Sequence, residues 1–294
     1  MSAPQPAVAG FEWFDVTDPM SPQVDDLARR FNLHPLQIED CRHRPQRAKT
    51  EERGDYIFTV LKHARSSSVA EFDDLDVFFS ADYLITIHAE GCPVIDKLRA
   101  RIEQEKPQRL DRIFYMLVDL VVDEYQPLLD AIADDIADIE SEVLSHPEPD
   151  MLARIFALKR GLIEFRRVAG AMREVVNILA RHEGGALGDD LDPYFRDVYD
   201  HLVRTTEFIE SYRDLLTGSL DIYLSAVANR TNEVMKVLTI WGTVALPLLI
   251  ITGFFGMNLK LPWIEHPHGT AFAGLLMIAS TLSVLLYFKS KKWF

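Results

Sequence analysis

The stretch Val237–Phe255 (VLTIWGTVALPLLIITGFF) and the later stretch Thr270–Phe288 (TAFAGLLMIASTLSVLLYF) decide the architecture of this chain. Neither contains a charged residue. At 1.5 Å per residue, each run would extend over roughly 28 Å, close to the thickness of a bilayer's hydrocarbon core. Two such runs near the end of an otherwise charged chain favour membrane-spanning helices over buried core helices. We therefore predict transmembrane helices over 237–255 and 270–288, joined by the short loop 256–269.

Basic residues set the expected orientation of this hairpin. Arg230 and Lys236 precede the first run, and the tail 289–294 is rich in lysine, whereas the loop carries only Lys260 as a cation. Because cytoplasmic flanks are enriched in Lys and Arg, both chain termini are expected in the cytoplasm.

Ahead of the hairpin the chain is acidic. The whole chain has a formal charge of −14, and Glu265 is its only acid after residue 236. An acidic body argues against a nucleic-acid partner and suits a protein that gathers cations. The two cysteines, Cys41 and Cys92, show no pairing pattern and fit a reducing compartment. No phosphate-binding loop, dinucleotide fingerprint or nucleophile elbow is present, so an enzyme is a poor interpretation.

Residues 1–108 are predicted to form a cytosolic α/β domain. Segments 11–16, 56–63 and 76–88 are rich in β-branched and aromatic residues, and Ser80-Ala81-Asp82 splits the last into a hairpin. Ser21-Pro22 and His34-Pro35 each begin a short helix.

Residues 109–236 are predicted to be a helical region. Apolar spacing indicates helices over 110–144, with a kink or restart at Pro127, and over 151–182, which carries many basic residues. A third helix, a stalk over about 191–236, has no stop before the membrane run. Such a helix of about 60 residues would be roughly 90 Å long and needs partner subunits to cover its apolar face. We therefore expect an oligomer.

One face of the first membrane run contains no charge. Its members recur every three or four residues: Met235, Leu238, Gly242, Leu246, Leu249, Gly253 and Gly256. As a pore wall this face would be narrow and apolar. Small residues also pack helices together, and spacing alone leaves both interpretations open.

Acidic residues are the main metal-binding candidates in the body. Glu39 and Asp40 end one helical turn, Asp119 and Asp123 share a helix face, and further acids follow at 130, 134 and 138. Carboxylates suit hard cations such as Mg²⁺, although solvated helix faces look the same. The histidines show no zinc-binding spacing.

The sequence resembles the CorA family of magnesium and cobalt channels. The resemblance is carried by YFRDVYDH (194–201), DIYLSAVANRTNEVMKVLTI (221–240), the tripeptide Gly256-Met257-Asn258 and the terminal YFKSKKWF, and HPLQIED (34–40) supports it. It extends from about Trp13 to the end. A Gly-Met-Asn tripeptide alone is weak, but its position at the end of the first of two C-terminal spans is specific.

This resemblance implies a homopentameric funnel in a bacterial or archaeal inner membrane that conducts divalent cations, with Mg²⁺ as substrate and regulatory ligand and no other cofactor. Asn258 would ring the outer entrance and contact the ion's water shell, which suits Mg²⁺. Asn232, Met235 and Leu238 would form the cytosolic constriction, with Leu246 and Leu249 farther along the pore.

The resemblance also implies a regulatory cation site between subunits. Asp40 and Asp197 match the carboxylates that hold this cation, with Glu39 and Asp119 beside them. Bound Mg²⁺ would hold the interfaces closed, and its loss would let the acids repel one another.

The loop after the tripeptide departs from the pattern of magnesium importers. It reads LKLPWIEHPHG, with Lys260 where an acid is common, and it carries His266 and His268. The loop therefore leaves open a zinc transporter of the ZntB type on the same scaffold. A membrane-anchored binding protein that does not conduct is the alternative from a different class.

Overall fold

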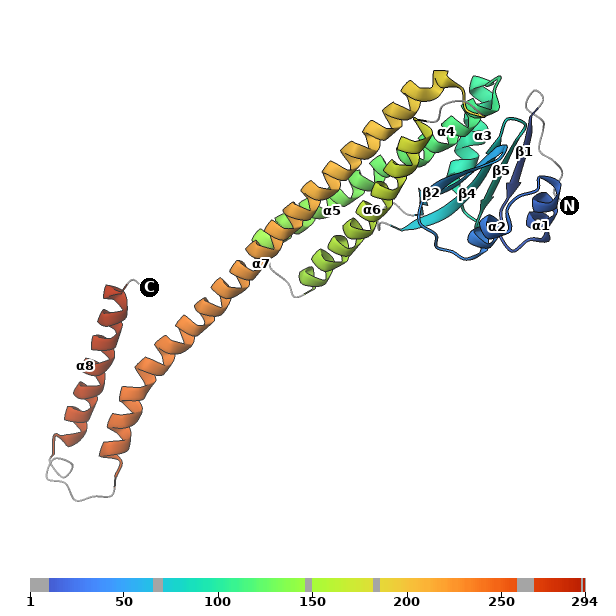
Figure 1. Ribbon diagram of the computed structural model, residues 1–294. Helices are drawn as coiled ribbons and strands as arrows, with labels where there is room; N and C mark the ends of the chain where they lie inside the picture. Colours follow the sequence, from blue (N-terminus) through green and yellow to red (C-terminus); the bar gives the residue numbers. More distant parts are fainter. Residues whose placement is uncertain are drawn as a thin grey trace. The chain divides into compact units, whose positions relative to one another are not determined.

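The computed structural model describes residues 11–65, 71–145, 150–181, 186–257, 267–291 and 293. The chain divides into two compact units, residues 1–220 and 221–294 (Figure 1). The predicted boundary at 108/109 lies within the first unit, because the sheet and the helices that follow it pack together. The predicted α+β architecture with a long helix and two C-terminal apolar helices is confirmed.

The first unit is built on one five-stranded sheet. Its strands are β1 (Glu12–Val16), β2 (Lys49–Arg53), β3 (Tyr56–Ala64), β4 (Phe72–Ser80) and β5 (Tyr83–His88), in the order β1-β5-β4-β3-β2. β1 runs parallel to β5 with Glu12 opposite Tyr83, and the other pairs are antiparallel. The predicted hairpin at Ser80 is confirmed, since β4 and β5 pair across it.

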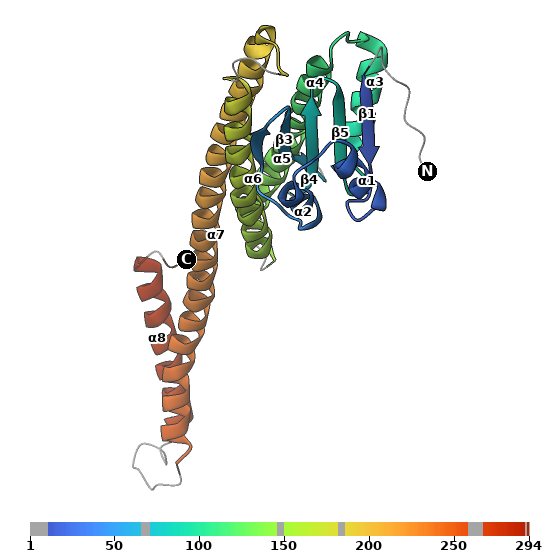
Figure 2. The same cartoon turned by 45° about the vertical axis from the view of Figure 1, so that its right-hand side comes forward.

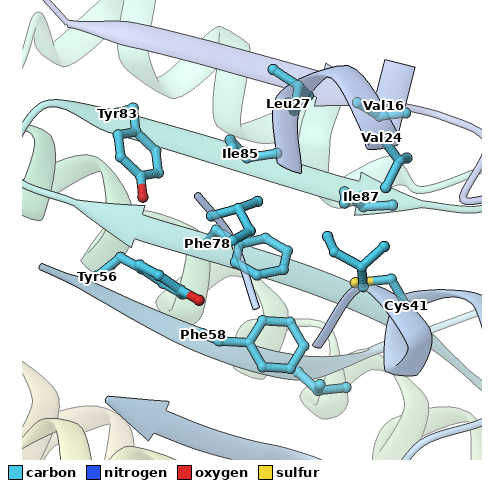
Figure 3. Packing of buried hydrophobic residues seen from close by; sticks show 13 residues of the cluster. Val16, Val24, Leu27, Cys41, Tyr56, Phe58, Phe78, Tyr83, Ile85 and Ile87 are labelled. Atoms are coloured by element: carbon cyan, nitrogen blue, oxygen red, sulfur yellow. The ribbon is translucent and has the colours of Figure 1, made fainter. Parts of the chain in front are cut away.

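Two short helices cover one face of this sheet. They are α1 (Pro22–Arg30), whose N-cap Ser21 accepts a hydrogen bond from the Gln23 N–H, and α2 (Pro35–Arg42). Side chains alternate between the faces of a strand, so Phe58, Phe78 and Ile85 meet these helices (Figure 3). The aromatic rings of Phe58 and Phe78 lie 4.6 Å apart at the centre of this core.

Longer helices pack on the opposite face and at the β2 edge (Figure 2). They are α3 (Pro93–Glu105), α4 (Leu110–Asp123), α5 (Tyr125–Ser145) and α6 (Met151–Leu179). Phe79 points away from α1 and α2 and stacks on Phe114 of α4, with ring centroids 4.7 Å apart. The predicted helix 110–144 is in fact α4 and α5, which meet at Glu124; Pro127 lies in the first turn of α5, where its missing N–H costs nothing.

A short 3-10 turn, η1 (Asp189–Leu191), leads into α7 (Asp192–Phe255), a single helix of 64 residues. Within the first unit its buried residues follow a heptad pattern: Phe195, Val198, Leu202, Thr205, Ile209, Leu216 and Ser219. This seam packs on the preceding helices, and Arg166 of α6 pairs with Glu210 at 2.9 Å. The helix continues through Pro247 without interruption.

The second unit contains the remainder of α7 and α8 (Gly269–Ser290). The two helices contact at Phe255 and Phe272, whose ring centroids lie 6.5 Å apart. Both pass the length and hydropathy criteria for membrane spans.

Candidate functional site: an uncovered helix face and two acidic groups

In the second unit, α8 shields one face of α7. Half-buried residues on α7 recur at helical spacing: Ile240, Val244, Pro247, Leu248, Ile251 and Phe255. The α8 face that meets them is lined mainly by small residues, including Gly269, Ala273, Gly274, Ser280 and Thr281. The same face also carries the larger Met277, Val284 and Phe288.

The opposite face of α7 is left uncovered. Met235, Leu238, Leu246 and Leu249 are all more than half exposed, with Leu249 at 68%. Gly242, Gly253 and Gly256 lie on this face, and a Cβ built on Gly242 or Gly253 would touch no neighbouring side chain. We call these seven residues the uncovered face. It is the set that the spacing placed on one face, and α8 does not cover it.

The predicted constriction and entrance lie at the two ends of this face. Asn232 is exposed on α7, one turn before Met235. At the other end, α7 stops at Phe255, the Gly256 N–H donates to the Thr252 carbonyl, and Met257 is exposed. Asn258 lies outside the described residues, as do Lys260, Glu265 and His266.

The first predicted acidic group lies on α2. The Asp40 carboxylate is half-buried and accepts a hydrogen bond from the Lys49 ammonium of β2, with Oδ2 and Nζ 2.8 Å apart. Lys49 also bonds Glu51 at 2.6 Å. These contacts raise the pKa of Lys49 against the opposing effect of its partial burial. Glu39 is exposed, with its carboxylate 4.0 Å from the His43 ring.

The second acidic group lies on α4 and α7. Asp119 is largely buried and pairs with Arg101 of α3, with 2.7 Å between Oδ2 and Nη1. Burial, and then the charge of Asp119, raise the pKa of Asp123, and His201 and Arg101 oppose that rise. Asp197 is exposed on α7, and its Oδ2 lies 3.8 Å from Nε2 of His201.

The fold keeps the two acidic groups apart within one chain. Glu39 and Asp40 belong to the sheet face covered by α2, whereas Asp119 belongs to the face covered by α4 (Figure 2). Among the described residues, no three His, Cys, Asp or Glu side chains come close enough to hold a metal ion. A cation held by both groups would therefore need a second copy of the chain.

Sequence reasoning missed the basic partners of these acids. Lys49 lies in β2, a strand of sequence KTEER that shows no apolar alternation. Arg101 lies in α3, which was also missed, although Val94, Ile95, Leu98 and Ile102 recur at helical spacing after Pro93. That spacing is a signal that would have located α3.

Comparison with known proteins identifies the family. The family model described as CorA-like Mg²⁺ transporter protein matches residues 8–292. The chain belongs to this family. The cobalt/magnesium transport protein CorA of Thermotoga maritima is 36% identical over 278 residues, which cover 92% of this chain and 79% of that one.

Solved structures of CorA-like proteins share the fold. The complete structure of the CorA magnesium transporter from Methanocaldococcus jannaschii matches with a TM-score of 0.85 at 23% identity, covering 97% of this chain and 92% of that chain. The full-length CmaX protein matches with a TM-score of 0.80 at 22% identity, covering 96% of this chain and 89% of that chain. The protein is thus a CorA-like divalent metal cation transporter of the membrane, with two candidate spans.

Proposed function

We propose that this CorA-like protein is a homopentameric channel that carries Mg²⁺, and also Co²⁺ or Ni²⁺, across the inner membrane. The observation that supports this most directly is the uncovered face of α7. Its seven residues carry no charge, and no other described residue of the second unit covers them. Five such faces around an axis would enclose a narrow apolar path that passes hydrated ions and closes by dewetting. Both termini would lie in the cytoplasm.

The path would have two defined ends. Asn232, Met235 and Leu238 would form the cytosolic constriction, and Leu246, Leu249 and Gly253 the pore beyond it. Gly256, Met257 and Asn258 would form the entrance. An amide ring at Asn258 would bind the water shell rather than the bare ion, which fits the slow dehydration of Mg²⁺.

Regulation would follow from the separation of the two acidic groups. Glu39 and Asp40 of one subunit would face Asp197 and Asp119 of the next, and cytosolic Mg²⁺ would bridge them. When cytosolic Mg²⁺ falls, facing carboxylates would repel one another and loosen the closed pentamer.

The proposal is tested by ion flux into liposomes that contain the purified protein. Asn258→Ala should abolish Mg²⁺ uptake, because it removes the entrance ligand, whereas Asn177→Ala on α6 is the matched control and should transport normally. Undiminished uptake by the Asn258 variant would remove the entrance assignment. No uptake by the unmodified protein, with any of the metals, would favour the non-conducting anchor.

Regulation needs its own measurement. Asp40→Asn and Asp197→Asn should each weaken inhibition of uptake by Mg²⁺ trapped inside the liposomes. Glu71→Gln, which alters an exposed acid elsewhere in the first unit, is the control. Unchanged inhibition in both site variants would contradict a regulatory role for these carboxylates.

A ZntB-type zinc transporter is the second candidate, because the loop after the tripeptide has Lys260 where magnesium importers commonly carry an acid. Uptake of Mg²⁺, Co²⁺, Ni²⁺ and Zn²⁺ should be compared in the same liposomes, with and without a pH gradient. Zn²⁺ uptake that rises with an imposed pH gradient, together with absent Mg²⁺ uptake, would replace the magnesium proposal.

A further inference from the structure

A basic groove lies in the first unit, between the segment 45–48 and the middle of α6. It has a volume of about 680 Å³. Its charged lining comprises Arg47, Lys62, Arg166, Arg167, Arg173 and Glu174. Such a concentration of arginine is unexpected in a chain whose net charge is −14. The transport path and the acidic groups described above make no use of it.

The arginines of the groove are only weakly neutralised. Arg47 pairs with Glu174 at 2.9 Å, Arg166 with Glu210 at 2.9 Å and Arg167 with Glu164 at 2.6 Å; all six side chains are more than 40% exposed. Exposed pairs of this kind contribute about 0–1 kcal/mol and exchange partners readily. Arg173 forms no ion pair with any part of the chain that the structure describes. By contrast, Lys62 is buried and bonded to Asp74, so its charge is already matched.

One wall of the groove is held rigidly. The Arg44 side chain donates to the carbonyls of Cys41, Asp74 and Ile87 at 2.9, 2.8 and 3.0 Å, and it pairs with Asp76. The Gln46 N–H donates to the Asp74 carboxylate at 2.6 Å. Arg47 therefore projects from a backbone that is fixed on its N-terminal side. A fixed backbone lowers the entropy cost of recruiting its side chain to a ligand.

The opposite wall is open at its centre. Gly170 lies in the middle of α6, and a Cβ added there would meet nothing within 4 Å. Arg166 lies four residues before Gly170 and Arg173 three residues after it, so both lie on one side of α6, and Arg167 also lines the groove. The missing side chain leaves room for a small ligand between the guanidinium groups.

We propose that this groove binds a phosphate-bearing anion. Guanidinium groups present paired donors that match phosphate oxygens and form stronger bonds to them than to water. The volume suits one small phosphorylated molecule rather than a single ion. A soluble polyphosphate and an anionic lipid headgroup offer this same chemistry, and the experiment below separates them.

The test uses the full-length protein in detergent and isothermal titration calorimetry at low ionic strength. One arm titrates inorganic pyrophosphate, with free Mg²⁺ held constant by a metal buffer so that chelation does not contribute. The other titrates dihexanoyl phosphatidylglycerol below its micelle concentration, against dihexanoyl phosphatidylcholine. We expect saturable binding of at least one phosphate probe, with no binding of the choline lipid. Pyrophosphate binding alone indicates a soluble ligand, and phosphatidylglycerol binding alone indicates a headgroup.

Two matched pairs of variants locate the site. Arg167→Gln/Arg173→Gln should lower the affinity for the phosphate probe at least tenfold. The control Arg154→Gln/Arg160→Gln removes the same charge from α6 outside the groove and should change this affinity less than twofold. Gly170→Glu should also lower the affinity at least tenfold, while Gly170→Ala leaves it unchanged. The proposal is overturned if the unmodified protein binds neither phosphate probe, or if both double variants lose affinity equally.

Discussion

The two units of this chain treat apolar surface in opposite ways. In the first unit both faces of the sheet are covered, and Phe58, Phe78, Phe79 and Phe114 are completely buried. In the second unit, Leu238, Leu246 and Leu249 are more than half exposed on α7, and Ile278 is 70% exposed on α8. The first unit thus has a hydrophobic core of its own, although Leu36 and Ile163 remain exposed, whereas the apolar surface of the second unit needs its surroundings to cover it.

Two exposed surfaces of the second unit differ in composition. The outward face of α8 consists of large aliphatic residues such as Leu275, Ile278 and Leu282, which is what contact with lipid requires. The uncovered face of α7 instead combines three glycines with leucine and methionine. The two surfaces therefore differ in the sizes of their residues, as expected if one faces lipid and the other lines the proposed path.

The largest expected effect concerns the core of the first unit. Phe114→Ala should lower the free energy of unfolding of this unit by about 3–5 kcal/mol, because it leaves a cavity beside Phe79. Phe208 lies on α7 and is 45% exposed, so Phe208→Ala should lower the free energy of unfolding far less. Thermal unfolding of the purified protein, followed by near-ultraviolet circular dichroism, measures both. Equal losses would mean that Phe208 is buried in the assembled protein.

A pair of lysine substitutions tests the two exposed surfaces of the second unit. Ile278→Lys should disfavour membrane insertion by about 3 kcal/mol, because it places an ammonium in lipid. Leu249→Lys should insert better but reduce Mg²⁺ uptake at least tenfold, since the added charges repel a divalent cation. The membrane-inserted fraction and liposome uptake are the measurements. Poor insertion of both variants would place the uncovered face in lipid.

A buried acid gives the first unit a dependence on pH. Burial raises the pKa of Asp76 to about 6, despite the opposing charge of Arg44. In the unfolded chain this acid titrates near its ordinary value of 3.8, so the folded state binds the proton more tightly. Its contribution to the free energy of unfolding is present below about pH 4 and is lost as the pH rises through about 6, an effect of about 3 kcal/mol.

Asp76→Asn should remove this component, and the melting temperature of the variant should change less between pH 4 and 6 than that of the unmodified protein. Asp73→Asn is a useful control. Hydrogen bonding to Arg65, opposed by partial burial, lowers the pKa of Asp73. Asp73 should therefore stabilise the fold more as the pH rises, the opposite of the effect of Asp76. If the melting temperature of the Asp76 variant changed with pH as much as that of the unmodified protein, Asp76 would not be the source of the pH dependence.

The smallest expected effect compares two hydroxyl groups. Ser21→Ala should destabilise α1 by about 1 kcal/mol, because the Ser21 oxygen satisfies a Gln23 N–H that no helical carbonyl reaches. Thr252→Val on α7 should lower the free energy of unfolding by less, because the Thr252 hydroxyl donates to the Leu248 carbonyl, which already accepts a hydrogen bond within the helix. Thermal unfolding resolves the first change, and uptake should be unaffected by either. A larger loss for Thr252→Val would indicate a hydroxyl contact outside the helix.

Sequence patterns predicted the features that depend on local chemistry. The caps at Ser21 and His34, the turn at Ser80 and the uncovered face of α7 all follow from residue type and spacing. Strand β2 could not be predicted in this way, because KTEER is stabilised by pairing with β3, including a 3.0 Å contact between the Thr50 and Thr59 hydroxyls. The separation of Asp40 from Asp119 also needed the topology, since it depends on which sheet face each helix covers.

Strand β2 has a consequence for assembly. It forms one edge of the sheet, and its outer hydrogen-bonding groups are flanked by Lys49, Glu51, Glu52 and Arg53. Exposed edge strands can pair with strands of other molecules and so cause aggregation. Charged side chains on the edge discourage this pairing. In the proposed pentamer, these charges would keep copies of the chain from joining sheet to sheet. Contacts between copies would then fall to the helices.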